Sequence, residues 1–162
     1  MVWIVEVGYK KDVTDSVGFL TKKEIEDLGI EGVEEVRSIN TYTITGEIGE
    51  EEVKKVCEEL LSDNQIQHYG YMGKGVNKSI KHEIPNAWLV EVGLKPGVMD
   101  AVGMSTLNAI EILGIDGARE VKTGTKYLII GDIPEETVRK ICRRLLVNNL
   151  IQHYRVQKIG GK

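Results

Sequence analysis

The sequence predicts an α+β fold built from two tandem copies of one β-α-β-β-α-β unit, paired as an intramolecular pseudo-dimer. The first observation is a repeat: IQHY at 66–69 recurs at 151–154, an offset of 85 residues. At this offset 35 of the 67 residue pairs between 3–69 and 88–154 are identical, without a gap. The second observation is that both copies alternate short β-branched segments with segments of helical periodicity. Each copy is therefore expected to form an antiparallel sheet with helices on one face.

Each copy opens with a strand and a helix. The strand is WIVEVGY in the first copy and WLVEVGL in the second, and both are apolar and β-branched. Asp15 and Asp100 then fit the N-cap of a helix. The helix has one apolar stripe in each copy: Val17, Thr21, Ile25 and Leu28, matched by Val102, Thr106, Ile110 and Leu113. Gly29 and Gly114 fit its end, because glycine adopts the left-handed backbone of a C-terminal stop.

The rest of each copy predicts a hairpin, a second helix and a last strand. The hairpin joins VEEVRS to TYTITGEI and AREVKT to KYLIIGDI, turning near Asn40 and near Gly124-Thr125. The second helix has apolar residues at i, i+3, i+4, i+7 and i+8 in both copies: Val53, Val56, Cys57, Leu60 and Leu61, matched by Val138, Ile141, Cys142, Leu145 and Leu146. IQHY then opens the closing strand. This order is that of the ferredoxin-like fold.

The repeat sets the expected domains and the class of protein. Residues 1–71 form the first repeat, 72–86 a linker rich in glycine and lysine, and 87–162 the second repeat; a short strand at 79–84 is left open. No stretch approaches the roughly 18 apolar residues that span a bilayer. The N-terminus is typical of a strand rather than a signal peptide, so a cytoplasmic protein is expected. A net charge of −4 argues against nucleic acid as the main partner.

The residues that invite a catalytic interpretation have simpler ones. His68 and His153 lack metal-ligand spacing around them, so we expect hydrogen-bonded strand histidines and no metal. Cys57 and Cys142 lie on the apolar stripe of the second helix, as core residues do. GKGVNKS lacks the spacing of a phosphate loop. RNA-binding forms of this fold stack bases on aromatic residues of the central strands, and the one phenylalanine here, Phe19, is predicted on a helix, which argues against RNA binding. We therefore expect no catalytic residue and no cofactor site, as in a binding or assembly module.

The differences between the copies indicate where partners bind. Residues 1–71 carry a charge of −9 and residues 72–162 a charge of +5. Charge reverses where Glu58 and Glu59 become Arg143 and Arg144, and four further swaps replace a polar residue with an apolar one: Lys22 to Leu107, Asp27 to Ile112, Ser62 to Val147 and Gln65 to Leu150. Large apolar residues outside a core stripe mark contact surfaces. The predicted partner interface comprises Leu107, Ile112, Arg143, Arg144, Val147 and Leu150.

Three segments resemble a known family. KPGVMDAVG is similar to the K-x-G-V-x-D-x-x-G start of that family's first helix, and NAIEILGI followed by VKTGT to the helix end and hairpin after it. The element C-x-x-L-L-x-N-x-x-I-x-x-Y is present at 142–154, and 57–69 keeps its spacing with Asp63 in place of the asparagine. Each copy thus resembles PurS, the small subunit of phosphoribosylformylglycinamidine synthase. The first copy departs from the pattern in KKDVTDSVG and VRSIN, and Ser16 and Ala101 stand where the family often has proline.

The resemblance implies a non-catalytic subunit in de novo purine biosynthesis. Such subunits typically form dimers between an ATP-dependent synthase subunit and a glutaminase subunit. The complex converts formylglycinamide ribonucleotide to the amidine, and the small subunit helps ammonia pass between the two sites. A fused pair would replace the dimer with one chain and let its ends diverge. A homodimer of the fused chain is left open.

The alternative is a tandem regulatory module of the ACT type, which has the same order of elements. Such a module binds a small effector, such as an amino acid, near glycine-rich turns. Gly8, Gly18, Gly93 and Gly103 are the candidate positions here. Thermal stabilisation by free amino acids would distinguish this module from an assembly subunit.

Overall fold

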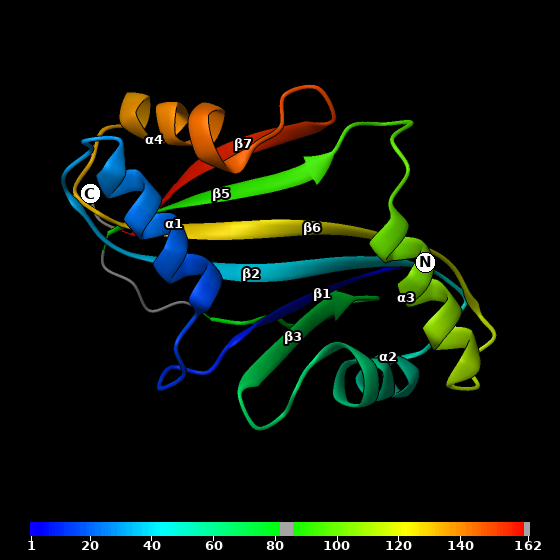
Figure 1. The fold of residues 1–162 in the computed structure, drawn as a ribbon. Coiled ribbons are helices and arrows are strands. Elements are labelled where there is room, and N and C mark those ends of the chain that lie inside the picture. The colour runs from blue at the N-terminus through cyan, green and yellow to red at the C-terminus, as the bar shows by residue number, and fades with distance from the viewer. Residues whose placement is uncertain (82–85, 161–162) are drawn as a thin grey trace. The chain divides into compact units, whose positions relative to one another are not determined.

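A computed structural model of the chain describes residues 1–81 and 86–160 and confirms the α+β class, with antiparallel strands and helices (Figure 1). Its elements in chain order are β1 (Val2–Tyr9), α1 (Ser16–Asp27), β2 (Val33–Gly46), α2 (Glu50–Val56), the π-helical turn η1 (Cys57–Leu61), β3 (Gln67–Gly73), β4 (Val76–Lys78), β5 (Ala87–Leu94), α3 (Ala101–Ile112), β6 (Ala118–Gly131), α4 (Glu135–Ile141), the π-helical turn η2 (Cys142–Leu146) and β7 (Gln152–Ile159). The pattern of the first repeat recurs in the second, apart from β4.

The middle of each repeat differs from the prediction, because each expected hairpin is one continuous strand. Strands β2 and β6 are 14 residues long and run straight through the predicted turns. Neither Asn40 nor Gly124 has the positive φ of a tight hairpin turn, and Gly124 instead pairs with Gly93 in the ladder between β5 and β6. The hairpin prediction is therefore wrong: the two apolar segments form the two ends of a single long strand.

The long strands divide the chain into two compact units that do not coincide with the repeats. The first unit holds Met1–Val13, Asn40–Lys81 and Met99–Thr123. The second holds 14–39, 86–98 and 124–160 of the described residues. Helix α3 of the second repeat thus belongs to the first unit, and α1 of the first repeat belongs to the second unit. The two repeats are interleaved, and each unit needs both of them.

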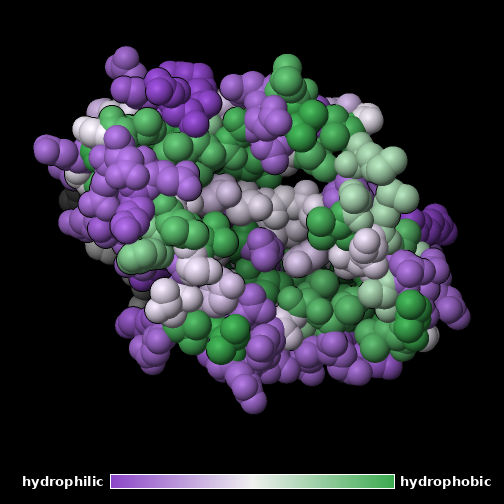
Figure 2. Space-filling model, viewed as in Figure 1, coloured by the Kyte–Doolittle hydropathy of each residue, from purple (hydrophilic) through white to green (hydrophobic). Residues whose placement is uncertain are grey.

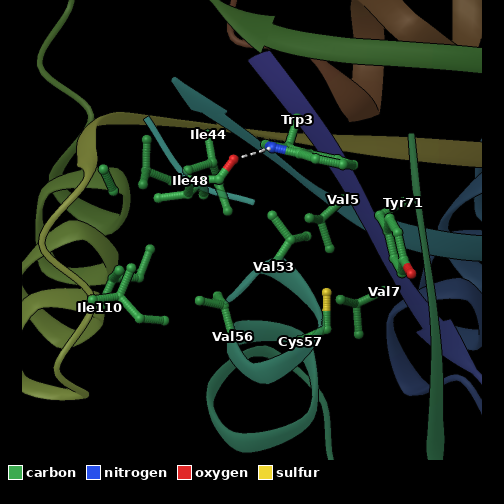
Figure 3. Packing of buried hydrophobic residues seen from close by; sticks show 13 residues of the cluster. Trp3, Val5, Val7, Ile44, Ile48, Val53, Val56, Cys57, Tyr71 and Ile110 are labelled. Atoms are coloured by element: carbon green, nitrogen blue, oxygen red, sulfur yellow. Dashed lines mark hydrogen bonds between the residues drawn. The ribbon is translucent and has the colours of Figure 1, made fainter. Parts of the chain in front are cut away.

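The first unit has strand order β4-β3-β1-β2-β6, and α2 and α3 cover one face of these strands (Figure 1). Strands β1 and β3 are antiparallel, from Ile4 opposite Met72 to Tyr9 opposite Gln67. The core combines first-repeat residues with four from the second repeat. Its members are Trp3, Val5, Val7, Ile44, Ile48, Val53, Val56, Cys57, Tyr71, Ile110, Ile115, Ala118 and Val121. Figure 3 shows Ile110 reaching from α3 toward Ile48 and Val56.

The second unit has the same design, but most of its core residues come from the second repeat and a few from the first. Its strand order is β2-β6-β5-β7, and β5 pairs antiparallel with both β6 and β7. Its main core comprises Ile25, Val36, Trp88, Val90, Val92, Ile129, Ile133, Val138, Ile141, Cys142 and Val147. The two tryptophans are held alike: the indole N–H of Trp3 donates to the carbonyl of Ile48 and that of Trp88 to the carbonyl of Ile133, both at 3.0 Å.

Part of the expected linker is ordered as strand. Met72 and Gly73 end β3, and β4 then pairs back onto β3 through a turn at Lys74-Gly75. Lys74 and Gly75 both have positive φ, which this tight turn requires. A short strand therefore lies at 76–78, ahead of the strand that was left open at 79–84. Residues 82–85, including His82 and the end of that possible strand, lie outside the described residues.

Candidate interaction surfaces

The start of the first helix shows that the most distinctive motif of the repeats is structural. The carboxylate of Asp100 accepts from the N–H of Gly103 at 2.8 Å, which caps α3, and from the N–H of Thr123 at 2.6 Å. A Cβ on Gly103 would collide with the carbonyl oxygen of Val121, so glycine is needed for the helix to approach the strand. D-x-x-G thus fastens α3 to β6, and Asp15 and its neighbours fasten α1 to β2 in the same way.

The same packing bears on the alternative of an effector site. Gly18 and Gly103, two of the four glycines proposed for it, lie against the backbone carbonyls of Val36 and Val121. At Gly93 the nearest neighbour is the ring of His153, 3.3 Å from an ideal Cβ position. Gly18 and Gly103 are therefore needed where a helix packs closely on a strand, and Gly93 lies against the ring of His153, so packing accounts for glycine at these three positions.

The six residues of the predicted partner interface fall into two groups. Leu107 and Ile112 lie on α3 in the first unit, whereas Arg143, Arg144, Val147 and Leu150 lie in the second unit. Their exposure also differs. Ile112 is 79% exposed and Leu150 is 86% exposed, but Val147 is a core residue at 8% and Leu107 packs partly buried against the first core. Leu107 and Val147 therefore pack against the cores, beneath the exposed members of the predicted interface.

Helix α3 presents one outward face without charge. Five exposed residues at helical spacing form it: Ala101, Met104, Ser105, Asn108 and Ile112, called here the α3 face. Glu111, beside this face, is the single charged residue of the helix. Green and white surface gathers over α3 in Figure 2. Sequence reasoning selected only Ile112 of the five, although the near absence of charge in AVGMSTLNAIEI was a visible signal.

The corresponding positions of α1 are different in kind. They hold Ser16, Phe19, Leu20, Lys23 and Asp27, so two of five are charged. Helix α1 as a whole carries five charged residues. Both helices bury equivalent isoleucines, Ile25 and Ile110, at 0% exposure. The two helices thus share an inner face and differ in the outer one.

The turn after η2 in the second unit presents a basic and apolar surface. Arg143 and Arg144 are exposed in η2, whose last turn closes with the N–H of Val147 donating to the carbonyl of Cys142 at 3.0 Å. Two further bonds hold the loop: the side chain of Asn148 accepts from the N–H of Leu150, and the ammonium of Lys95 donates to the carbonyl of Asn149 at 2.6 Å. We name Arg143, Arg144 and Leu150 the basic turn.

The equivalent region of the first unit is acidic and internally paired. The hydroxyl of Tyr69 donates to Glu58 at 2.7 Å, and that of Tyr71 donates to Glu50 at 2.7 Å. Lys78 also donates to Glu50 at 2.8 Å. Burial, followed by the bond to Glu58, raises the pKa of Tyr69. The bonds from Lys78 and Tyr71 lower the pKa of Glu50, so this carboxylate stays charged near neutral pH.

The histidines occupy equivalent places in separate units. His68 lies opposite Gly8 in the β1–β3 ladder, and His153 lies opposite Gly93 in the β5–β7 ladder. Partial desolvation, with a smaller contribution from Lys10, lowers the pKa of His68. Within 1–81 and 86–160, no three His, Cys, Asp or Glu side chains are grouped as a metal site would need.

The cysteines are core residues, as the helical stripe predicted. Cys57 and Cys142 are both free thiols at 0% exposure, one in each core. Burial, with the charge of Glu58 as a smaller cause, raises the pKa of Cys57 to about 12, and burial raises that of Cys142 to about 11. Such thiols stay protonated near neutral pH and are poor nucleophiles.

The fold and the surfaces define an internally duplicated α+β protein whose outstanding features are two unlike exposed surfaces. Across the described part of the chain, no helix is long and apolar enough to cross a membrane. The family model of PurS, described as phosphoribosylformylglycinamidine (FGAM) synthase, matches residues 3–74 and again 88–160. The chain therefore belongs to the PurS family and carries two copies of its domain.

Individual PurS proteins are similar to this chain over part of its length. The phosphoribosylformylglycinamidine synthase subunit PurS of Archaeoglobus fulgidus is 34% identical over 74 residues, which are 41% of this chain and 90% of that protein. The subunit of the same name from Synechocystis is 29% identical over 70 residues, 40% of this chain and 70% of that protein. The crystal structure of PurS from Methanocaldococcus jannaschii, a subunit of formylglycinamide ribonucleotide amidotransferase, matches 48% of this chain and 99% of its own at 28% identity, with a TM-score of 0.43.

Proposed function

We propose that the chain is a non-catalytic subunit of phosphoribosylformylglycinamidine synthase that bridges the ATP-dependent synthase subunit and the glutaminase subunit in the cytoplasm. The observation that carries the proposal is the double match to PurS, at 3–74 and 88–160 of one chain. One molecule thereby supplies two PurS domains. The interleaved units support this, because a single chain then holds both cores at a fixed one-to-one ratio.

The unlike surfaces give the bridge its two ends. In the second unit, the basic turn combines two arginines, which suit bidentate pairing with carboxylates, and a leucine that is 86% exposed. The matching surface of the first unit carries Glu58 and Glu59 instead. A partner that prefers one surface is repelled by the other, since like charges oppose binding. We propose that one partner subunit contacts the basic turn, with Val147 supporting it from the core.

The bridge would assist ammonia transfer by holding the two active sites in register. Ammonia released by a glutaminase is lost to solvent if the synthase site is not docked beside it. A subunit that only positions its neighbours needs no catalytic residue, and the buried, protonated thiols of Cys57 and Cys142 fit that role. No cofactor is proposed for this chain.

A reconstitution tests the proposal. The synthase and glutaminase subunits of the same organism are purified separately and assayed for amidine formation with and without this chain. With glutamine as nitrogen source, activity should depend on the chain. With a high concentration of ammonium salt, the synthase alone should work, because no transfer is needed. Glutamine-dependent activity that is unchanged without the chain, or failure of the chain to co-elute with either subunit, contradicts the proposal.

A further inference from the structure

The closing strands of the two repeats differ in what lies along their outer edges. In the first unit, β4 pairs with the outer edge of β3 at Tyr71, Met72 and Gly73. In the second unit, β7 is the last strand in the order, and no described strand pairs with its outer edge (Figure 1). Burial agrees with this difference: Gly70 and Tyr71 are buried in β3, whereas every residue of β7 is at least partly exposed. The outer edge of β7 is therefore open among the described residues, where its counterpart is covered.

The register of β7 shows which of its backbone groups point outward. In an antiparallel ladder, successive residues turn their N–H and C=O alternately toward the partner strand and away from it. The N–H of Lys95 donates to the carbonyl of Ile151 at 2.8 Å, next to the last pair of the β5–β7 ladder. Every second residue after Ile151 is therefore bonded to β5. The residues between them, Tyr154, Val156 and Lys158, direct their N–H and C=O toward the open edge.

Two of these outward positions match the ones that β4 occupies in the first unit. At the offset of 85 residues, Val156 and Lys158 correspond to Tyr71 and Gly73. Tyr71 and Gly73 have the same place in the alternation of β3, and both pair with β4. An open row of N–H and C=O groups binds an extended segment that completes the ladder. The first unit thus shows the kind of occupant that suits this edge, a short extended segment like the three-residue β4.

The side chains of β7 favour an acidic segment. The strand QHYRVQKI exposes His153, Arg155 and Lys158 and contains no acidic residue. Arg155 pairs with Glu91 on β5, yet its side chain remains 78% exposed. Opposite charges on neighbouring strands attract and like charges repel, so an acidic segment is favoured and a second copy of β7 is disfavoured. The basic turn, which includes Leu150, comes directly before this strand, so one partner can cover both.

We propose that the outer edge of β7 binds an extended, acidic segment of the partner subunit that contacts the basic turn. The segment pairs with Val156 and Lys158 as β4 pairs with β3, and it adds one strand to the second unit. This inference rests on the proposed function, from which it takes the partner. The equivalent edge of the first unit is already covered by β4, so strand addition directs this partner to the second unit.

Hydrogen–deuterium exchange of the whole chain, alone and with the purified synthase or glutaminase subunit, tests the inference. Exchange is followed residue by residue by mass spectrometry. In the chain alone the amides of Val156 and Lys158 should exchange rapidly, and with one of the subunits they should exchange about tenfold more slowly or less. Tyr71 and Gly73 are the internal control: their amides already face β4, so neither subunit should change their exchange.

A matched pair of substitutions separates the backbone from the side chain. Lys158→Ala and Lys158→Pro both remove the ammonium, which lies 4.7 Å from the centre of the Trp88 ring. Proline alone also removes the outward N–H. Because that N–H is not bonded to β5, both variants should fold and unfold at the same midpoint. Lys158→Pro should bind the partner subunit about tenfold more weakly than Lys158→Ala.

The outcomes distinguish this inference from the proposed function. Capture of a subunit without slower exchange in β7, or equal affinities of the two variants, overturns the inference and leaves the proposed function standing. Protection of β7 that grows with the concentration of the chain alone also overturns it, because the edge would then belong to a second copy. Failure to capture either subunit removes both the inference and the proposed function.

Discussion

The carboxylate of Asp100 accepts a hydrogen bond from the backbone N–H of Thr123 at 2.6 Å and another from the hydroxyl of Thr123 at 2.9 Å. The two residues are 23 positions apart in the chain. The same carboxylate caps α3 through Gly103. One side chain thus fixes the start of a helix and the middle of the long strand β6. This clamp matters because α3 lies in the unit formed largely by the first repeat, to which its own repeat contributes only the segment Met99–Thr123.

Asp100→Ala is expected to destabilise the chain by about 3 kcal/mol, because it removes a helix cap and hydrogen bonds to a charged group. The free energy of unfolding from urea titration measures the effect. Asp116→Ala, an exposed aspartate after the same helix, should change it by less than about 0.5 kcal/mol. Equal effects of the two substitutions would argue against the clamp.

Two isoleucines on α3 separate its inner face from its outer face. Ile110 is 0% exposed in the first core and Ile112 is 79% exposed. Ile110→Ala should cost about 3 kcal/mol through a cavity, whereas Ile112→Ala should be near neutral for the monomer. In a Trp88→Phe background, Ile110→Ala should also alter the fluorescence of Trp3, which shares that core. An unchanged Trp3 spectrum would mean that α3 does not contribute to this core.

The buried thiols should be silent in the native state. Neither Cys57 nor Cys142 should react with a thiol reagent at pH 8, and both should react at once in denaturant. Their raised pKa values also affect stability. Above the ordinary value of 9.0 the unfolded thiols ionise first, so stability falls as the pH rises toward the folded values of about 11 and about 12. Rapid labelling of native protein at both sites would refute the core placement.

The basic turn should be needed for capture of one partner subunit. Arg143→Glu with Arg144→Glu is expected to weaken that complex about tenfold or more, since each reversed charge would oppose a carboxylate surface. Lys140→Glu, an exposed charge on the preceding helix, is the matched control. Surface plasmon resonance with each subunit in turn measures both variants. Identical affinities of wild type and double variant for both subunits would remove the basic turn from the interface.

Much of the architecture followed from local pattern. The offset of 85 residues, the caps at Asp15 and Asp100 and the stripe through Cys57 and Cys142 all predicted elements that are present. These signals depend on residues within one turn or one strand of each other, which a sequence displays directly. The α+β class and the antiparallel pairing followed from them.

The interleaving of the repeats could not be read in this way. A hairpin and a long strand have the same alternation of apolar residues, and the choice between them depends on the distant strand that pairs with each half. Leu107 and Val147 were expected at a surface because their counterparts are polar. Each instead packs against a core, where the equivalent first-repeat positions, Lys22 and Ser62, are themselves only partly exposed.

The interleaved units are the central claim, and separating the repeats tests them most directly. Residues 1–81 and 82–162 are expressed as two chains and examined by circular dichroism and analytical ultracentrifugation, alone and mixed at equal concentration. Each chain alone lacks a helix that its core needs, so neither should be a folded monomer. The mixture should form a one-to-one complex with the spectrum and tryptophan fluorescence of the intact protein. A stable, cooperatively unfolding monomer from either chain alone would contradict the interleaved fold.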